Sequence, residues 1–310
     1  MSAAATPLAS LPARLPPRRA ATISLARVLD VLVVAACLAA ATWFVVRANA
    51  VLGYRWNWSI IPTYLVRIDP DTGAWAPNLL LNGFFTTIRL AVWSLLIGTI
   101  VGILFAAMRL SRRPVLRWIA RCFVELVRNA PPIVLIFVLY FFVSSQLMPA
   151  LGLDRMLRAA PVLVQAVITA VLAPPERIND VLAGLACLGL FAGAYVTEIM
   201  RAGLQSVPST QIEAAQALGM HGWAVFRTVI LPPAIRNVLP ALAGQFIVSI
   251  KDSSLVALIS IQELTFMTSE VSSTTRRFFE AWLFTAALYF TLCFACSLLF
   301  RGLERRWRRA

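Results

Sequence analysis

Residues 208–233, PSTQIEAAQALGMHGWAVFRTVILPP, form a moderately polar segment. It lies between two apolar segments that are each long enough to cross a bilayer. The first half carries the signals of a short helix. Thr210 can act as N-cap, and Glu213, three residues later, completes a capping box. Helix-forming residues follow, and Gly219 stands where a helix commonly ends in a left-handed residue. We therefore predict a short helix that starts near Thr210 and stops at Gly219.

A second short helix is predicted over about residues 223–231. It is expected to stop at Pro232 and Pro233, because proline lacks the backbone N–H that a helix interior needs. Two short helices joined at a glycine would form a rigid pair that projects from a membrane domain.

The surface of this helical pair suits contact with another protein. The small side chains of Ala214 and Ala215 would let a partner come close, and Ile212 and Leu218 could fill a groove on it. An amphipathic loop that lies on the lipid headgroups is the alternative interpretation.

The segment EAAQALGMHGWAVFRTVILPPAIR, residues 213–236, resembles the EAA loop of permease subunits of ABC importers, in the branch that carries polar amino acids. The resemblance continues on both sides of the loop and extends from about residue 80 to the C-terminus. The matching stretches are NGFFTTIRL (82–90), GAYVTEIMRAGLQSVP (193–208), LPALAGQFIVSIKDSSLVALISIQEL (239–264) and YFTLCFACSLLFRGLERR (289–306).

This resemblance implies a type I importer permease with a core of five membrane spans. It implies that the loop is the coupling helix that docks into a separate ATPase. The residues carried over as ATPase-coupling are Glu213, Ala214, Ala215 and Gly219. Further implied partners are a dimer of ATPase subunits, a second permease subunit (identical or different), a periplasmic solute-binding protein and a small polar amino acid. ATP would be bound by the partner subunit, and no cofactor is expected in this chain.

The composition is that of an all-α integral membrane protein. The chain has 310 residues, is 60% hydrophobic and has a mean hydropathy of +0.79. The net charge of +14 comes from 27 arginines and a single lysine. Because the arginines are spread over loops that flank apolar segments, membrane topology explains them better than nucleic-acid binding.

About six spans are predicted, one of them an extra span before the core of five. An Ala-x-Ala at 48–50 raises the alternative of a cleaved signal peptide, but the apolar run is longer than the usual signal core. The predicted segments are a disordered cytoplasmic N-terminus (1–27), the extra span (28–46), a periplasmic loop (47–78), the permease domain (79–303, with the EAA coupling loop at 208–233) and a basic cytoplasmic tail (304–310).

Within the permease domain the predicted spans are about 90–108 (with an interfacial helix as a possible extension back to 79), 122–144, 181–200, one that begins near 234, and 281–300. The second of these is expected to kink at Pro131 and Pro132, after a Glu125–Arg128 pair one turn apart. The apolar stretch 161–173 is too short for a span and is predicted to be an interfacial or re-entrant insertion.

The distribution of arginine predicts the orientation. The N-terminus, the loop 109–121, the coupling loop and the tail carry 4, 5, 2 and 5 arginines, counting Arg201 and Arg227 for the coupling loop. With six spans all four fall on one side, which the positive-inside rule makes cytoplasmic. Both termini are therefore expected in the cytoplasm of a bacterium, and the protein in its inner membrane.

The residues that enzymes use are scarce. The only lysine, Lys251, follows Ile250 rather than glycine, which excludes a Walker A motif. There is one histidine, and the Cys293–Cys296 CxxC lies in an apolar span without further ligands at metal-binding spacing. We expect neither catalysis nor a metal site.

Two polar clusters in apolar segments are candidate sites on the translocation path or its gate. The first, Lys251, Asp252, Ser253 and Ser254, interrupts a span, where a charge is costly unless it is paired or hydrated. A Lys–Asp pair that reaches the outer interface is the alternative. The second is Glu198, which lies one turn from Arg201, and for which a structural ion pair is the alternative to a place along the path.

These observations favour a permease subunit that moves polar amino acids by alternating access, driven by a separate ATPase. An ion-coupled secondary transporter of small polar solutes is the alternative, with Lys251–Asp252 as its only candidate coupling site. A membrane assembly or sensor subunit would explain the projecting helices but not the polar cluster inside a span.

Overall fold

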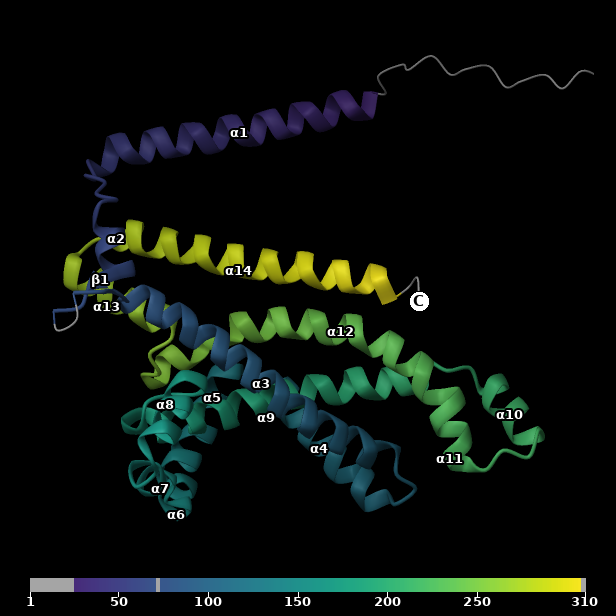
Figure 1. The fold of residues 1–310 in the computed structure, drawn as a ribbon. Coiled ribbons are helices and arrows are strands. Elements are labelled where there is room, and N and C mark those ends of the chain that lie inside the picture. The colour runs from purple at the N-terminus through teal and green to yellow at the C-terminus, as the bar shows by residue number, and fades with distance from the viewer. Residues whose placement is uncertain (1–24, 71–72, 308–310) are drawn as a thin grey trace, which may run out of the picture. The chain divides into compact units, whose positions relative to one another are not determined.

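A computed structural model describes residues 25–70 and 73–307, and almost all of these residues are helical (Figure 1). The chain divides into two compact units, residues 1–56 and 57–310. In the first unit the described part is one long helix, α1 (Leu25–Leu52). The predicted disorder of residues 1–27 falls mostly outside the described residues and stays a prediction.

The second unit holds the remaining elements. Its helices are α2 (Ile60–Leu65), α3 (Leu79–Leu110), α4 (Pro114–Asn129), α5 (Pro132–Phe142), α6 (Met148–Leu151), α7 (Leu153–Arg158), α8 (Val162–Val171), α9 (Ile178–Gln205), α10 (Ser209–Ala217), α11 (Gly222–Val225), α12 (Leu231–Asp252), α13 (Leu264–Thr275) and α14 (Phe278–Trp307). Two strands, β1 (Val66–Ile68) and β2 (Trp75–Pro77), pair antiparallel with Val66 opposite Pro77.

Five continuous helical segments of the described chain are long and apolar enough to cross a membrane. They are Leu79–Leu110, Pro132–Leu151, Pro175–Gln205, Gly222–Ile259 and Phe278–Arg305. These are the five spans of the predicted core. Helix α1 covers the extra span predicted at 28–46, but its described apolar part, Val28–Trp43, is shorter than the other five. Whether α1 crosses the membrane stays a prediction.

The centre of the second unit is the contact between α3 and α9, where glycines let the two backbones approach closely. A Cβ atom placed on Gly102 of α3 would lie 2.4 Å from Cγ1 of Val196 on α9. A Cβ atom on Gly193 of α9 would lie 2.6 Å from Cγ1 of Val101. Because lipid tails are as apolar as the side chains, the hydrophobic effect does little to join helices in a membrane. Close packing of this kind therefore holds the spans together.

The predicted single span over 122–144 is wrong. The structure has two helices there, because α4 ends at Asn129 and α5 begins at Pro132. Two consecutive prolines withhold two N–H donors, and Pro131 also restricts Ala130 to an extended conformation (ψ 144°). No ion pair joins Glu125 to Arg128 in the described chain. The Arg128 guanidinium instead lies 5.4 Å from the centre of the Tyr195 ring.

The prolines at 232–233 do not end a helix, contrary to the prediction. They follow Leu231, the first residue of α12, inside a longer run of helix. A π-helical turn, Phe226–Ile230, leads into them, and the Leu231 N–H donates to the Phe226 carbonyl five residues back. The chain is therefore helical without interruption from Gly222 to Ile259.

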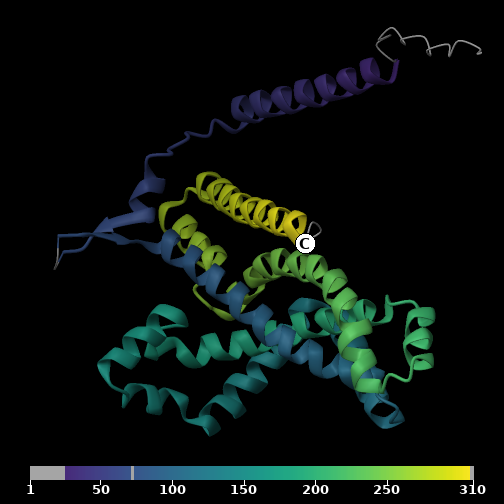
Figure 2. The ribbon, with the colours of Figure 1, turned by 45° about the vertical axis from the view of Figure 1, so that its right-hand side comes forward.

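The segment 145–179 folds into the short helices α6, α7 and α8, none of which is long enough to span a bilayer. Figures 1 and 2 both show α6–α8 at one end of α9, and α10 and α11 at the other. Since α9 has 28 residues, the two groups lie about 40 Å apart along it.

Candidate functional site

The helix at the start of the coupling loop, α10, begins two residues earlier than the predicted N-cap at Thr210 implies, and it lacks the predicted capping box. It begins at Ser209, with Pro208 at the N-cap position and no side-chain hydrogen bond to the cap. Thr210 is therefore inside the helix. Pro208, with φ fixed at −58° and ψ at 137°, sets the direction of the chain without a capping side chain.

Gly219 ends this helix as predicted, in the left-handed region at φ +80°. The Gly219 N–H donates to the Gln216 carbonyl (2.9 Å) and the Met220 N–H to the Ala215 carbonyl (3.2 Å), so the last carbonyls of α10 are satisfied. His221 then caps α11, since its Nδ1 accepts from the Ala224 N–H at 3.3 Å. The sequence analysis assigned no role to His221.

The four residues carried over as ATPase-coupling do not share one surface. Glu213, Ala214 and Gly219 are exposed, whereas Ala215 is only 6% exposed. The prediction that Ala215 offers contact area to a partner is therefore corrected, because its methyl group packs inside the chain. Leu218 is 83% exposed and is the large apolar side chain that α10 presents outward.

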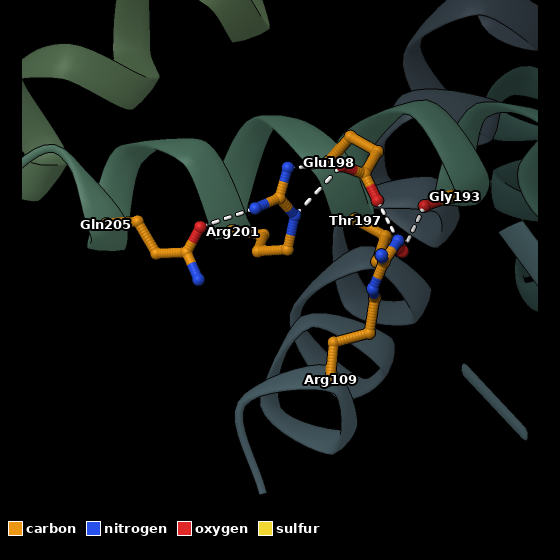
Figure 3. A network of polar contacts seen from close by, with 6 residues as sticks. All are labelled: Arg109, Gly193, Thr197, Glu198, Arg201 and Gln205. Atoms are coloured by element: carbon orange, nitrogen blue, oxygen red, sulfur yellow. Dashed lines mark hydrogen bonds and ion pairs between the residues drawn. The ribbon is translucent and has the colours of Figure 1, made fainter. Parts of the chain in front are cut away.

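Glu198 on α9 belongs to a three-residue charged cluster near the same end (Figure 3). Its Oε2 accepts from Arg201 Nε at 2.9 Å, which confirms the predicted pair one turn apart. Its Oε1 pairs with Arg109 at the end of α3, a partner that the sequence did not indicate. The cluster ties α3 to α9, as the ion-pair interpretation expects, and a place for Glu198 on the path stays a prediction.

Helix α12 carries a polar face at its far end. Gln245, Ser249 and Asp252 are spaced four and three residues apart, which puts them on one side of the helix. Gln245 is 7% exposed and Ser249 3%. In the described chain neither Gln245 Nε2 nor Ser249 Oγ has a hydrogen-bond partner, which is unusual for buried polar atoms.

The predicted polar cluster lies where α12 ends. Lys251 is exposed and Asp252 half-buried, and no ion pair links them in the described chain. Ser253 is fully buried, and its Oγ donates to the Ile250 carbonyl at 2.7 Å. Ser254 Oγ donates to the Lys251 carbonyl at 2.7 Å, and a 3₁₀ turn, Ser253–Ile259, follows.

Glu263, which the sequence analysis did not single out, is a buried carboxylate at the start of α13. It accepts from Phe266 N–H (2.9 Å), Tyr289 OH (2.7 Å) and Thr87 Oγ1 (3.2 Å). Burial raises the pKa of this carboxyl, and these hydrogen bonds offset part of the effect. Glu263 thus joins α3, α13 and α14. Its position just before an apolar helix, where an N-cap is expected, was the sequence signal that could have identified it.

No group of three or more metal-binding side chains lies together in the described chain. The five cysteines are free, and Cys187 is buried while the others line helix surfaces. The polar features of the molecule are thus a projecting helical pair at one end, an ion-pair cluster beside it, and unsatisfied polar atoms inside a spanning helix.

Five apolar spans with such features define the membrane subunit of a transporter. The chain belongs to the family of binding-protein-dependent transport system inner membrane components, whose model matches residues 98–309.

Several curated proteins are similar over most of their length. The glutamate/aspartate import permease protein GltK of Escherichia coli O157:H7 is 31% identical, over 76% of this chain and 97% of its own. The octopine transport system permease protein OccM of Rhizobium meliloti is 35% identical, over 73% and 84%. The glutamine transport system permease protein GlnP of Escherichia coli K12 is 30% identical, over 74% and 93%.

Solved structures agree on the fold. The crystal structure of an amino acid ABC transporter with histidines has a chain that is 32% identical, with a TM-score of 0.60 over 74% of this chain and 94% of that one. An inward-facing MetNI methionine ABC transporter chain is 17% identical, with a TM-score of 0.51 over 72% and 95%, which supports the fold alone.

Family membership decides between the functional classes. The chain is a multi-pass membrane component of an ABC importer rather than an ion-coupled transporter or an enzyme, and ATP hydrolysis is done by a partner chain. The family also implies a substrate-binding partner in the transporter complex.

Proposed function

We propose that this chain is the translocating subunit for polar amino acids, in the inner membrane of a bacterium, with both termini in the cytoplasm. The names of its relatives support the solute class, since they refer to glutamate, aspartate, glutamine and octopine. The arginine-rich segment 109–121 supports the orientation, because it lies at the same end of the bundle as α10 and α11 (Figure 1).

The observation that carries the proposal is the left-handed stop at Gly219. It fixes α10 and α11 as a compact pair whose outer surface bears Glu213, Ala214 and Leu218. In the proposed complex this surface docks on a dimeric ATPase, which binds ATP. A second permease subunit completes the pathway, and a solute-binding protein delivers the amino acid from outside. Movement of α10 and α11 then drives alternating access.

The proposed path follows the polar face of α12 toward Lys251, Asp252, Ser253 and Ser254. Gln245 Nε2 and Ser249 Oγ are buried beside this face without hydrogen-bond partners in the described chain, so a rearrangement that exposes them would offer them to a passing solute. We expect Lys251→Met and Asp252→Asn each to lower ATP-driven uptake at least tenfold in correctly inserted protein. Uptake near the unchanged level would remove these residues from the path.

The coupling role is tested by placing a side chain at Gly219. In proteoliposomes with the complete transporter, Gly219→Val should lower solute uptake at least tenfold, since a β-branched residue cannot easily adopt φ +80°. ATP hydrolysis by the partner should persist without matching transport.

Gly222→Val is the matched control. Gly222 lies three residues away, has no positive φ, and has open space where a Cβ atom would be. It should retain most uptake. Equal loss in both variants, or full coupled uptake in Gly219→Val, would contradict the coupling role.

A further inference from the structure

A cavity of about 850 Å³ lies among the first turns of α3, strand β1, helix α8 and the 3₁₀ turn Pro175–Arg177. This volume is within the range of pockets that hold small ligands. Helix α8, which lines the cavity, lies at the end of the bundle opposite α10 and α11 (Figures 1 and 2). It is also separate from the polar cluster at 251–254, none of whose residues line it.

Three arginines from three different elements line this cavity: Arg67 of β1, Arg89 of α3 and Arg177 of the 3₁₀ turn. Amides add hydrogen-bonding capacity, among them Asn82 and Gln262. No aspartate or glutamate is among the described lining residues. The wall of the cavity therefore carries three positive charges and no negative one.

The arginines have only neutral partners among the described residues. Arg89 Nη1 donates to the Thr169 carbonyl at 3.4 Å, and Arg177 Nη1 donates to the Gln262 side-chain oxygen. Arg67 has no hydrogen bond or ion pair from its guanidinium in the described chain. By contrast, Arg109 and Arg201 at the other end of the bundle share a carboxylate.

Arg89 makes the excess of charge costly. It is half-buried in the third turn of α3, whereas Arg67 and Arg177 are exposed. A half-buried cation is costly unless a counter-ion or water compensates it. No described side chain supplies the negative charge, so the cavity suits an anionic ligand.

The far wall of the cavity is one face of α8, a helix of the segment between α5 and α9. Val162, Gln165, Ala166, Thr169 and Ala170 recur at helical spacing along that face. Two of the five are alanines, which leaves room for a ligand. Helix α8 is joined to α3 at two points. Besides the bond from Arg89 to the Thr169 carbonyl, Trp93 Nε1 donates to the Val171 carbonyl at 3.1 Å.

We propose that this cavity is a carboxylate-binding site and that its ligand is a small free dicarboxylate, such as an acidic amino acid. A guanidinium matches a carboxylate with two parallel hydrogen bonds, so the two carboxylates can pair with two of the three arginines. The ammonium group of an amino acid would use an amide oxygen of the lining, such as Asn82 Oδ1. The site lies at the outer mouth of the importer, and that placement rests on the proposed orientation. The binding itself does not depend on transport.

The test is equilibrium binding of radiolabelled L-glutamate to the permease–ATPase complex in nanodiscs, without ATP and without a solute-binding protein. Glutarate should compete with the label, and L-glutamine and L-arginine should compete at least tenfold more weakly. Arg89→Gln and Arg177→Gln should each weaken L-glutamate binding tenfold or more, with Arg89→Lys intermediate. Arg158→Gln, which removes an exposed arginine of α7 outside the cavity, is the control and should bind normally.

Three outcomes would overturn the proposal. Glutamate and glutamine could compete equally, or the cavity variants could bind as tightly as the unaltered complex. Alternatively, no dicarboxylate could bind, while Arg67→Gln and Arg177→Gln weaken association with the solute-binding protein, which would assign the cavity to an acidic side chain of that protein.

Arg177 is exposed on a short turn, so its variant remains informative if Arg89→Gln does not assemble. ATP-driven uptake of a neutral amino acid tests the importer function separately.

Discussion

Helices α9 and α14 are similar in length and both are apolar enough to cross a membrane, yet they are packed very differently. Within the most apolar stretch of each helix, 67% of the residues are buried in α9 and only 6% in α14. Helix α9 contains Gly184, Gly189, Gly193 and Gly203, and each of them lies against a neighbouring side chain. Helix α14 has the single Gly302 and exposes large side chains such as Phe290 (69%). Small residues, rather than hydropathy, distinguish a span that contacts protein from one that faces lipid or a second subunit.

The largest effect should come from filling the interface between α3 and α9. In Gly102→Val the new side chain would meet the backbone and the side chain of Val196, with the first contact at 2.4 Å. Overpacking of this kind costs about 1–3 kcal/mol. We expect a clear fall in the thermal unfolding midpoint of the detergent-purified protein.

Gly302→Val on α14 is the matched control for this variant. A Cβ atom at Gly302 has no neighbour within 4 Å, so the midpoint should hardly change. If the two variants lose stability equally, glycine packing is not what separates the two helices.

A smaller effect is expected at the polar attachment of α14, where Tyr289 donates to the buried carboxylate of Glu263. Because burial raises the pKa of Glu263 above its ordinary value of 4.5, protonation is easier in the folded protein than in the unfolded chain. The stabilising contribution of this shift is fully present below pH 4.5 and is lost as the pH rises through the folded-state pKa.

The non-titrating variant Glu263→Gln provides the reference for this prediction. Unfolding midpoints measured from pH 4 to pH 8 should show the unaltered protein losing stability relative to the variant as the pH increases. A constant difference would show that the hydrogen bonds to Glu263 cancel the effect of its burial on the pKa. A difference that grows in favour of the unaltered protein with rising pH would show that they outweigh it.

Much of this architecture could be predicted from the sequence, because apolar length and arginine placement are local signals. The number of core spans, the position of four of them, the stop at Gly219 and the Glu198–Arg201 pair all follow from residues close together in the chain. The partner Arg109 could not be predicted in this way, since it approaches Glu198 only when α3 packs on α9. The same holds for the burial of Ala215 and for the three arginines of the cavity, which come from separate elements.

The prolines show a second kind of limit. Pro131 and Pro132 separate two helices, whereas Pro232 and Pro233 sit inside an uninterrupted one. The same dipeptide has both outcomes because a π-helical turn precedes the second pair and shifts the hydrogen-bonding register. Nothing in the dipeptide itself indicates which outcome applies.

The uninterrupted helix Gly222–Ile259 has a mechanical consequence. Its 38 residues are continuous but not straight, because they include a π-helical turn, Pro240 and a 3₁₀ turn, and Figure 1 shows α11 at an angle to α12. One end adjoins the segment proposed to meet the ATPase, and the other carries the serines at 253 and 254. A rotation of α11 can therefore reach the serines through one unbroken stretch of helix, with the π-helical turn and Pro240 as the places where that stretch bends.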